Sequence, residues 1–115
     1  MATITEDYCP KEIYRLLIEK GFDGEIHTSF DEEGYTQPSI TLQMAMKWLR
    51  EVHKLDIDVS IEYKNSKKVY YYSVLKKTVI RDIDCLHSET NFDSYEEAVE
   101  AAIKYCLKNL ENLIK

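Results

Sequence analysis

Cys85 and His87 come nearest in this sequence to a nucleophile and its base. A cysteine acts as a nucleophile when a neighbouring base takes its proton and a third group orients that base. On a strand the two side chains would point the same way about 7 Å apart, too far for a direct thiol–imidazole hydrogen bond. No third group is evident in the sequence. We therefore interpret the pair as a partly buried cysteine beside a surface histidine, and predict no catalytic residue.

Two further groups of residues have the side chains of a metal site without its pattern. His53, Asp56 and Asp58 combine an imidazole with carboxylates, but the histidine edges an apolar helical stripe and the aspartates lie on the polar face of a strand. The acidic run at 31–33 lacks the full ligand spacing of a calcium loop. The sequence has no cysteine pair with zinc spacing and no glycine-rich phosphate loop. We therefore expect no metal and no cofactor.

A run of three tyrosines among lysines is more typical of a binding surface. On a strand Tyr71 points to one face while Tyr70 and Tyr72 point to the other, so at least one or two of the rings should face solvent. Aromatic rings beside cations stack nucleic-acid bases or anchor a protein partner. The alternative is that tyrosine simply favours strands while its hydroxyl reaches water. The predicted binding residues are Lys64, Lys67, Lys68, Tyr70, Tyr72 and Lys76.

Charge is distributed unevenly along the chain. The net charge is −6, yet residues 63–81 contain six positive residues and no acidic one. An acidic body with a basic segment favours an acidic partner, or a second copy of the chain, over general affinity for nucleic acid.

Composition excludes several classes of protein. Glycine and proline are too scarce for a disordered chain, and no run reaches the roughly 18 apolar residues of a membrane span. The N-terminus lacks the basic and apolar regions of a signal peptide. The three cysteines are odd in number and widely spaced, which favours a reducing cytoplasm over a disulfide framework.

Helical periodicity predicts three helices. The central helix lies within residues 38–55. Its apolar stripe comprises Leu42, Ala45, Met46, Leu49, Val52 and His53. Met44, Trp48 and Leu55 flank this stripe. We expect Thr41 or Ser39 to cap this helix and expect it to be the most buried element, with Trp48 in the core.

The other two helices have clear end signals. A helix at about 10–20 should end at Gly21 in the left-handed conformation, with Phe22 folding back on Leu17. The last helix should begin at the capping box formed by residues 94–97 and continue as one apolar stripe from Ala98 to Leu113.

Alternating residues predict the strands. Residues 56–63 alternate between an apolar face, formed by Ile57, Val59, Ile61 and Tyr63, and a polar face. After a turn at 64–67, residues 69–75 form the returning strand. A short hairpin at 25–37 is expected around the turn 31–34. Thr78–Ile80 and Asp84–His87 each have strand character, and either would extend the sheet.

These elements predict a single α+β domain over residues 1–115, with residues 1–8 flexible. An antiparallel sheet of three to four strands would pack against about three helices in the order α-(ββ)-α-β-β-(β)-α. The helices would lie mainly on one face of the sheet.

Two segments of the sequence also resemble a known group of proteins. The segments TLQMAMKWLREVH (41–53) and FDSYEEAVEAAIKYCL (92–107) are similar to recurring segments of small proteins from gut Bacteroidales genomes and their phages. That group has no assigned activity. The resemblance implies a bacterial, phage or mobile-element origin and implies no site residues.

The sequence therefore predicts a small non-enzymatic binding protein of the cytoplasm. Its basic, tyrosine-rich hairpin would bind an acidic protein partner or a second copy of the chain, with no role for a membrane. An accessory protein that binds single-stranded nucleic acid is the alternative, although the net charge disfavours it. An enzyme of unknown type ranks third. A steep salt dependence would distinguish nucleic-acid binding from the first hypothesis.

Overall fold

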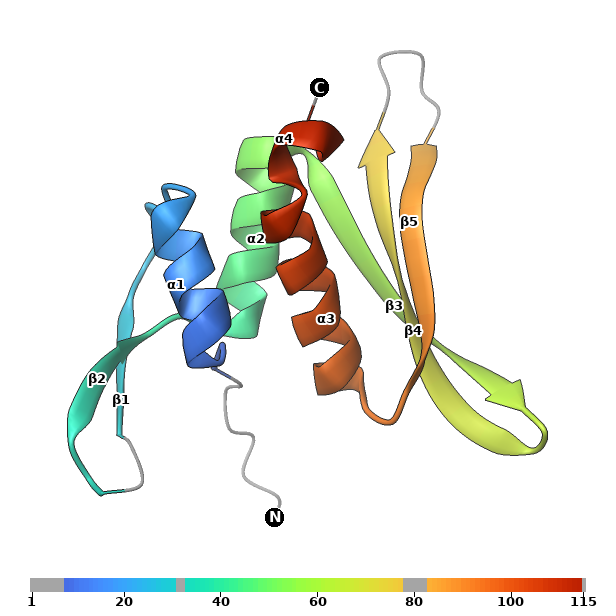
Figure 1. Ribbon diagram of the computed structural model, residues 1–115, viewed down its shortest axis with the longest axis horizontal. Coiled ribbons are helices and arrows are strands. Elements are labelled where there is room, and N and C mark those ends of the chain that lie inside the picture. Colours follow the sequence, from blue (N-terminus) through green and yellow to red (C-terminus); the bar gives the residue numbers. More distant parts are fainter. Residues whose placement is uncertain (1–7, 31–32, 78–82, 115) are drawn as a thin grey trace.

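The computed structural model describes residues 8–30, 33–77 and 83–114 (Figure 1). In this part of the chain the elements are α1 Lys11–Glu19, β1 His27–Phe30, β2 Thr36–Ser39, α2 Leu42–His53, β3 Leu55–Lys64, β4 Lys67–Lys77, β5 Ile83–Phe92, α3 Tyr95–Lys108 and α4 Leu110–Leu113. The predicted α+β class and element order are confirmed. Residues 1–7 and the possible strand at Thr78–Ile80 lie outside the described residues.

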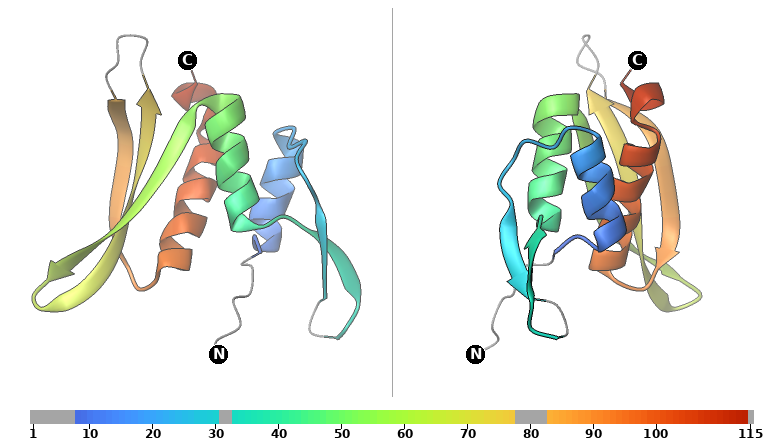
Figure 2. Two further views of the ribbon diagram at one scale, coloured as in Figure 1. Left: turned by 180° about the vertical axis from the view of Figure 1, so that it is seen from behind. Right: turned by 60° about the vertical axis from the view of Figure 1, so that its left-hand side comes forward.

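The strands form two antiparallel sheets. One sheet has the order β3-β4-β5, and the other is the β1-β2 hairpin. Helix α3 lies against the larger sheet, α2 packs on both α3 and β3, and α1 packs on α3. The β1-β2 hairpin lies beyond α1 and α2, on the side away from the larger sheet (Figure 2). The helices therefore cover one face of the three-stranded sheet, as predicted.

Helix α3, rather than α2, is the most buried helix, so our expectation for the central helix was wrong. Six residues of α3 are buried, whereas α2 buries four, and Val52 of its predicted stripe is 53% exposed. The physical reason is the position of each helix in the fold. The sheet covers α3 on one side and α1 and α2 cover it on the other, whereas one side of α2 faces solvent. Trp48 is nevertheless in the core, at 6% exposure.

The predicted helix ends are confirmed in detail. Thr41 Oγ1 accepts a hydrogen bond from the Met44 amide at 3.1 Å and so caps α2. Gly21 has a φ of +92°, and the Phe22 amide donates to the Leu17 carbonyl oxygen at 2.9 Å. This 6→1 hydrogen bond is that of a Schellman motif, which ends α1.

The last helix is not continuous. Helix α3 stops at Lys108, and Asn109 separates it from the single turn of α4. The Asn109 side-chain amide donates to the Tyr105 carbonyl oxygen at 2.9 Å. The Asn109 backbone amide donates to the same oxygen at 3.1 Å, so the two donors share this acceptor at the end of α3.

Ser94→Ala should lower the free energy of unfolding by about 1 kcal/mol, since it removes an N-cap acceptor. Ser94 Oγ accepts from the Glu97 amide at 3.1 Å, and the Glu97 carboxylate accepts from the Asp93 amide at 3.1 Å. Thermal melts measure the effect, with Ser94→Asp as a control that restores an acceptor. An unchanged midpoint for Ser94→Ala would show that tertiary packing alone holds the start of α3.

Candidate binding surface at the β3–β4 hairpin

The pairing of β3 with β4 fixes which residues share a face. Val59 lies opposite Tyr72, Ile61 opposite Tyr70, and Tyr63 opposite Lys68. Directly paired residues project to the same side of a sheet. The predicted grouping of the apolar β3 residues, and of Tyr70 with Tyr72, is therefore confirmed. This face is the one that the helices cover, because Tyr72 is fully buried.

Burial on this face decreases steadily toward the hairpin turn. Leu55, at the start of β3, is fully buried, whereas Ile61 is 47% exposed and Tyr63 is 73% exposed. On β4, Tyr72 is buried, but Tyr70 is half-buried and Lys68 is exposed. In Figure 1 the β3–β4 hairpin extends past the helices and curves away from them. Its outer half has no helix above it.

Element lengths explain why the cover ends there. The ten residues of β3 extend about 33 Å at the usual rise of a strand. The 14 residues of α3 span about 21 Å. A helix of that length leaves one end of the strand uncovered. The hairpin is closed tightly by Asn65 and Ser66, both with positive φ, as in a type I′ turn.

We call the uncovered end of the hairpin the tip surface. Ile61, Tyr63, Lys68 and Tyr70 lie on this face, and Lys67, which pairs with Lys64, projects from the opposite face at the same end. Lys68 Nζ lies 5.3 Å from the centre of the Tyr70 ring, within the range of a cation–π contact. Lys67 Nζ lies 3.8 Å from Asp93, but both side chains are more than 70% exposed. Such an exposed pair contributes little to stability. The tip surface thus combines accessible apolar area with two accessible cations.

Tyr72 does not belong to a binding surface, so its assignment from the sequence was wrong. Its side chain is fully buried, and its hydroxyl donates to the Glu89 carboxylate. Alternation along β4 placed Tyr70 and Tyr72 together correctly, but alternation carries no information about where the helical cover ends. Tyr71 lies on the opposite face and is half-buried.

The six predicted binding residues do not form one patch. Lys76 lies near the other end of β4 and donates to the Leu113 carbonyl oxygen at 3.2 Å. Lys64, next to the turn, lies 3.6 Å from Glu62 and donates to the Asn91 side chain at 3.4 Å. Of the predicted set, Lys68 and Tyr70 lie on the face of Ile61 and Tyr63, whereas Lys67 projects from the opposite face at the same end.

Sequence reasoning missed Ile61 and Tyr63. Both alternate with polar residues, and we therefore assigned them to the core. Their position next to the turn of a ten-residue strand was the signal that could have identified them. A side chain that far from the base of a hairpin lies beyond the reach of a short covering helix.

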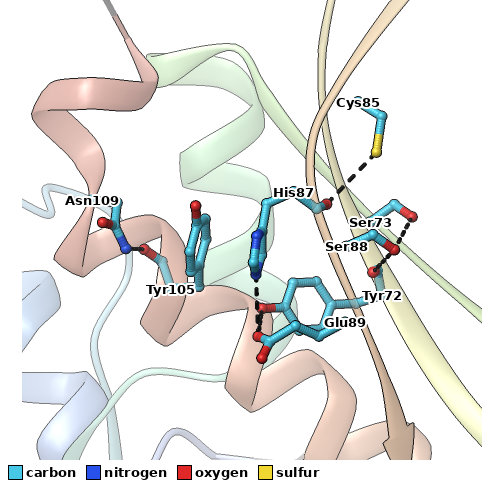
Figure 3. A network of polar contacts seen from close by, with 8 residues as sticks. All are labelled: Tyr72, Ser73, Cys85, His87, Ser88, Glu89, Tyr105 and Asn109. Carbon is cyan, nitrogen blue, oxygen red and sulfur yellow. Dashed lines mark hydrogen bonds and ion pairs between the residues drawn. The ribbon is translucent and has the colours of Figure 1, made fainter.

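Four side chains form a network that joins β4, β5 and α3 (Figure 3). His87 Nε2 lies 3.2 Å from Glu89 Oε2, the oxygen that also accepts from the Tyr72 hydroxyl. His87 Nε2 makes no hydrogen bond with a described residue, so this contact is an ion pair when the histidine is protonated. The His87 ring stacks on Tyr105, with centroids 3.7 Å apart and planes 7° apart.

The network shifts two pKa values. The hydrogen bond from Tyr72, followed by the contact with His87, lowers the pKa of Glu89 below its ordinary value of 4.5. Burial and the neighbouring Glu89 raise the pKa of Tyr72 above its ordinary range. Tyr72 therefore stays protonated at neutral pH and acts as a hydrogen-bond donor that ties β4 to β5.

Cys85 and His87 do not point the same way, contrary to expectation. Cys85 pairs with Leu75 and His87 pairs with Val74, so an irregularity of the ladder separates the two. His87 faces Tyr105 of α3, whereas the Cys85 thiol donates to the backbone carbonyl of His87 at 3.7 Å. The thiol and the imidazole therefore do not form a nucleophile–base pair here.

His53 and the aspartates of β3 are also kept apart. The His53 ring packs edge-on against Trp48, with centroids 4.7 Å apart, and burial lowers its pKa. Asp56 and Asp58 lie on the exposed face of β3. Among the described residues, no group of three or more histidine, cysteine or acidic side chains is arranged to hold a metal ion.

Comparisons with protein-family models, curated proteins and solved structures gave no match. The resemblance to the Bacteroidales group therefore stays a prediction. Within residues 8–30, 33–77 and 83–114, no helix is both long and apolar enough to cross a lipid bilayer.

Proposed function

We propose that this protein is a small non-enzymatic binding protein whose tip surface binds an acidic segment of another protein. The observation that carries the proposal is the uncovered end of the β3–β4 hairpin. There the face that elsewhere forms the core exposes Tyr63 and Ile61, at 73% and 47%, beside Lys68, and the exposed Lys67 projects from the opposite face at the same end. Exposed tyrosines that a partner can desolvate, next to cations, are typical anchors of protein interfaces.

Charge favours an acidic protein segment over nucleic acid. A chain with a net charge of −6 repels the phosphate backbone at long range, and counterion release from two lysines gives little affinity. A short acidic segment needs only local complementarity. Its apolar residues would cover Ile61 and Tyr63 while its carboxylates approach Lys67 and Lys68.

The experiment reverses the two lysines. Lys67→Glu with Lys68→Glu should weaken binding of a fluorescent acidic peptide containing leucine and phenylalanine by about tenfold or more, because attraction becomes repulsion across the interface. Fluorescence anisotropy at low and moderate salt measures the affinity. The melting temperature should stay nearly unchanged, since exposed charges contribute little to stability.

A matched control separates local from overall charge. Lys47→Glu with Arg50→Glu changes the net charge equally at two exposed positions of α2, away from the tip surface. The control should bind the peptide like the wild type. Equal weakening in both double variants would contradict the proposal, because it would show nonspecific attraction.

Two further measurements discriminate the alternatives. Tighter binding of an oligothymidylate of equal charge, with a steep salt dependence, would favour the nucleic-acid hypothesis. Light scattering tests self-association. A dimeric wild type and a monomeric Lys67→Glu, Lys68→Glu variant would show that the acidic partner is a second copy of the chain.

A further inference from the structure

A cavity of about 350 Å³ lies between the start of α1 and strand β2. Its lining residues are Cys9, Pro10, Lys11, Tyr14, Arg15, Gln37, Pro38 and Ser39. The volume is at the lower end of the range for small-molecule sites, which usually combine an apolar wall with a few polar groups. Here the two prolines and Cys9 supply the apolar part, and Lys11, Arg15 and Gln37 supply polar groups.

The charge of this cavity is opposite to that of the molecule. Among the described residues, its lining contains two cations and no carboxylate, although the chain carries a net charge of −6. Three other cavities lined by described residues contain more carboxylates than cations. One between α1 and α3 has three glutamates and one lysine, and the two others each have two acidic residues and one lysine.

The two cations belong to exposed residues. Lys11 and Arg15 are four residues apart on α1, so they lie on the same side of the helix. Neither forms an ion pair with any residue in the described part of the chain. Glu12, between them in sequence, instead contacts Lys104 and Lys108 of α3, at 3.0 and 3.6 Å. The arrangement directs the acidic side chain of this segment away from the cavity.

Lys11 also stands where a helix disfavours a positive charge. It is the first residue of α1, and the N-terminal end of a helix has a partial positive charge. Pro10 is the N-cap and supplies no side-chain acceptor for the amides of the first turn. Burial raises the pKa of the Cys9 thiol to about 12, so this wall of the cavity carries no negative charge at neutral pH.

We propose that this cavity binds a small organic anion, with a phosphate or carboxylate group between Lys11 and Arg15 and a short apolar group against Pro10 and Pro38. Arginine binds such groups through two parallel hydrogen bonds, and lysine adds a compact charge. The site lies on α1 and β2, and the tip surface lies on β3 and β4, so this activity is separate from the proposed function.

The test is a titration of the full chain, labelled with nitrogen-15, with phenyl phosphate, phenylacetate, inorganic phosphate and neutral benzyl alcohol. Phenyl phosphate or phenylacetate should give saturable amide shifts at residues 9–15 and 37–39, and benzyl alcohol should not. Lys11→Gln with Arg15→Gln should raise the dissociation constant about tenfold or more, because two charge-assisted contacts are lost. Its melting temperature should not fall, since Lys11 opposes the helix dipole.

Lys47→Gln with Arg50→Gln is the matched control and should bind phenyl phosphate and phenylacetate like the wild type. Strong binding of inorganic phosphate alone would assign the site to the anionic group without the apolar contact, and would overturn that part of the proposal. Four results would overturn the whole proposal. These are no saturable shifts, shifts centred on other residues, binding of benzyl alcohol as tight as that of the anions, and equal affinity of the two double variants for the anions.

Discussion

Trp48→Ala is expected to lower the free energy of unfolding by roughly 3–5 kcal/mol, the range for truncating a buried aromatic residue. Trp48 is 6% exposed and links α2 to the segment after α1. Its ring lies 5.7 Å from Phe22 and 4.7 Å from His53, measured between centroids, and its indole N–H donates to Asp23 at 3.1 Å. Truncation would leave a cavity where α2 meets the segment after α1.

Urea denaturation of the variant and of Trp48→Phe measures the effect. The phenylalanine variant keeps most of the packing and loses the hydrogen bond to Asp23, so it should lose only about 1 kcal/mol. Native tryptophan emission gives an independent check. Red-shifted, readily quenched emission from the wild type would contradict the core position of Trp48.

Tyr72→Ala should have an effect of similar size, about 3–5 kcal/mol, because the side chain is fully buried between the sheet and α3. Its two neighbours provide a matched series. Tyr70 and Tyr71 are half-buried, so their alanine variants should lose about 1 kcal/mol each, a typical value for point substitutions. Equal losses for all three tyrosines would contradict the assignment of Tyr72 to the core.

Tyr72→Phe isolates the hydrogen bond to Glu89. The pKa of Glu89 is lowered in the folded protein, so its contribution to stability is present above its ordinary pKa of 4.5 and is lost as the pH falls through the folded value. The phenylalanine variant lacks the largest cause of this shift. It should therefore be less stable than the wild type at pH 7, and the difference should shrink below pH 4.5. A constant difference across that range would contradict the role of the Tyr72–Glu89 contact.

The side chains of the helix ends were predictable because they act over a few residues. Thr41 and Ser94 each cap the helix that follows them, and Gly21 ends α1 through a local hydrogen-bond pattern. The alternation in β3 was predictable for the same reason, since successive strand residues point to opposite faces. Helix caps and strand alternation depend only on residues that are close together in the sequence.

The depth of burial was not predictable in this way. Val52 continues the apolar stripe of α2 yet is 53% exposed, and Tyr63 continues the apolar face of β3 yet is 73% exposed. Tyr72 was assigned to a surface and is in the core. In each case the outcome depends on which element covers that position, and the covering element comes from a distant part of the chain.

By itself, then, the sequence determined the α+β class, the order of the elements, their caps and the faces of β3 and β4. Only the tertiary structure decided that α3 is the most buried helix, that the tip surface lies beyond its cover, and that Lys11 and Arg15 line a cavity with β2. The physical reason is that periodicity and capping depend on neighbours within a turn or a strand. Burial and cavities depend on the lengths and packing of elements that meet only when the chain has folded.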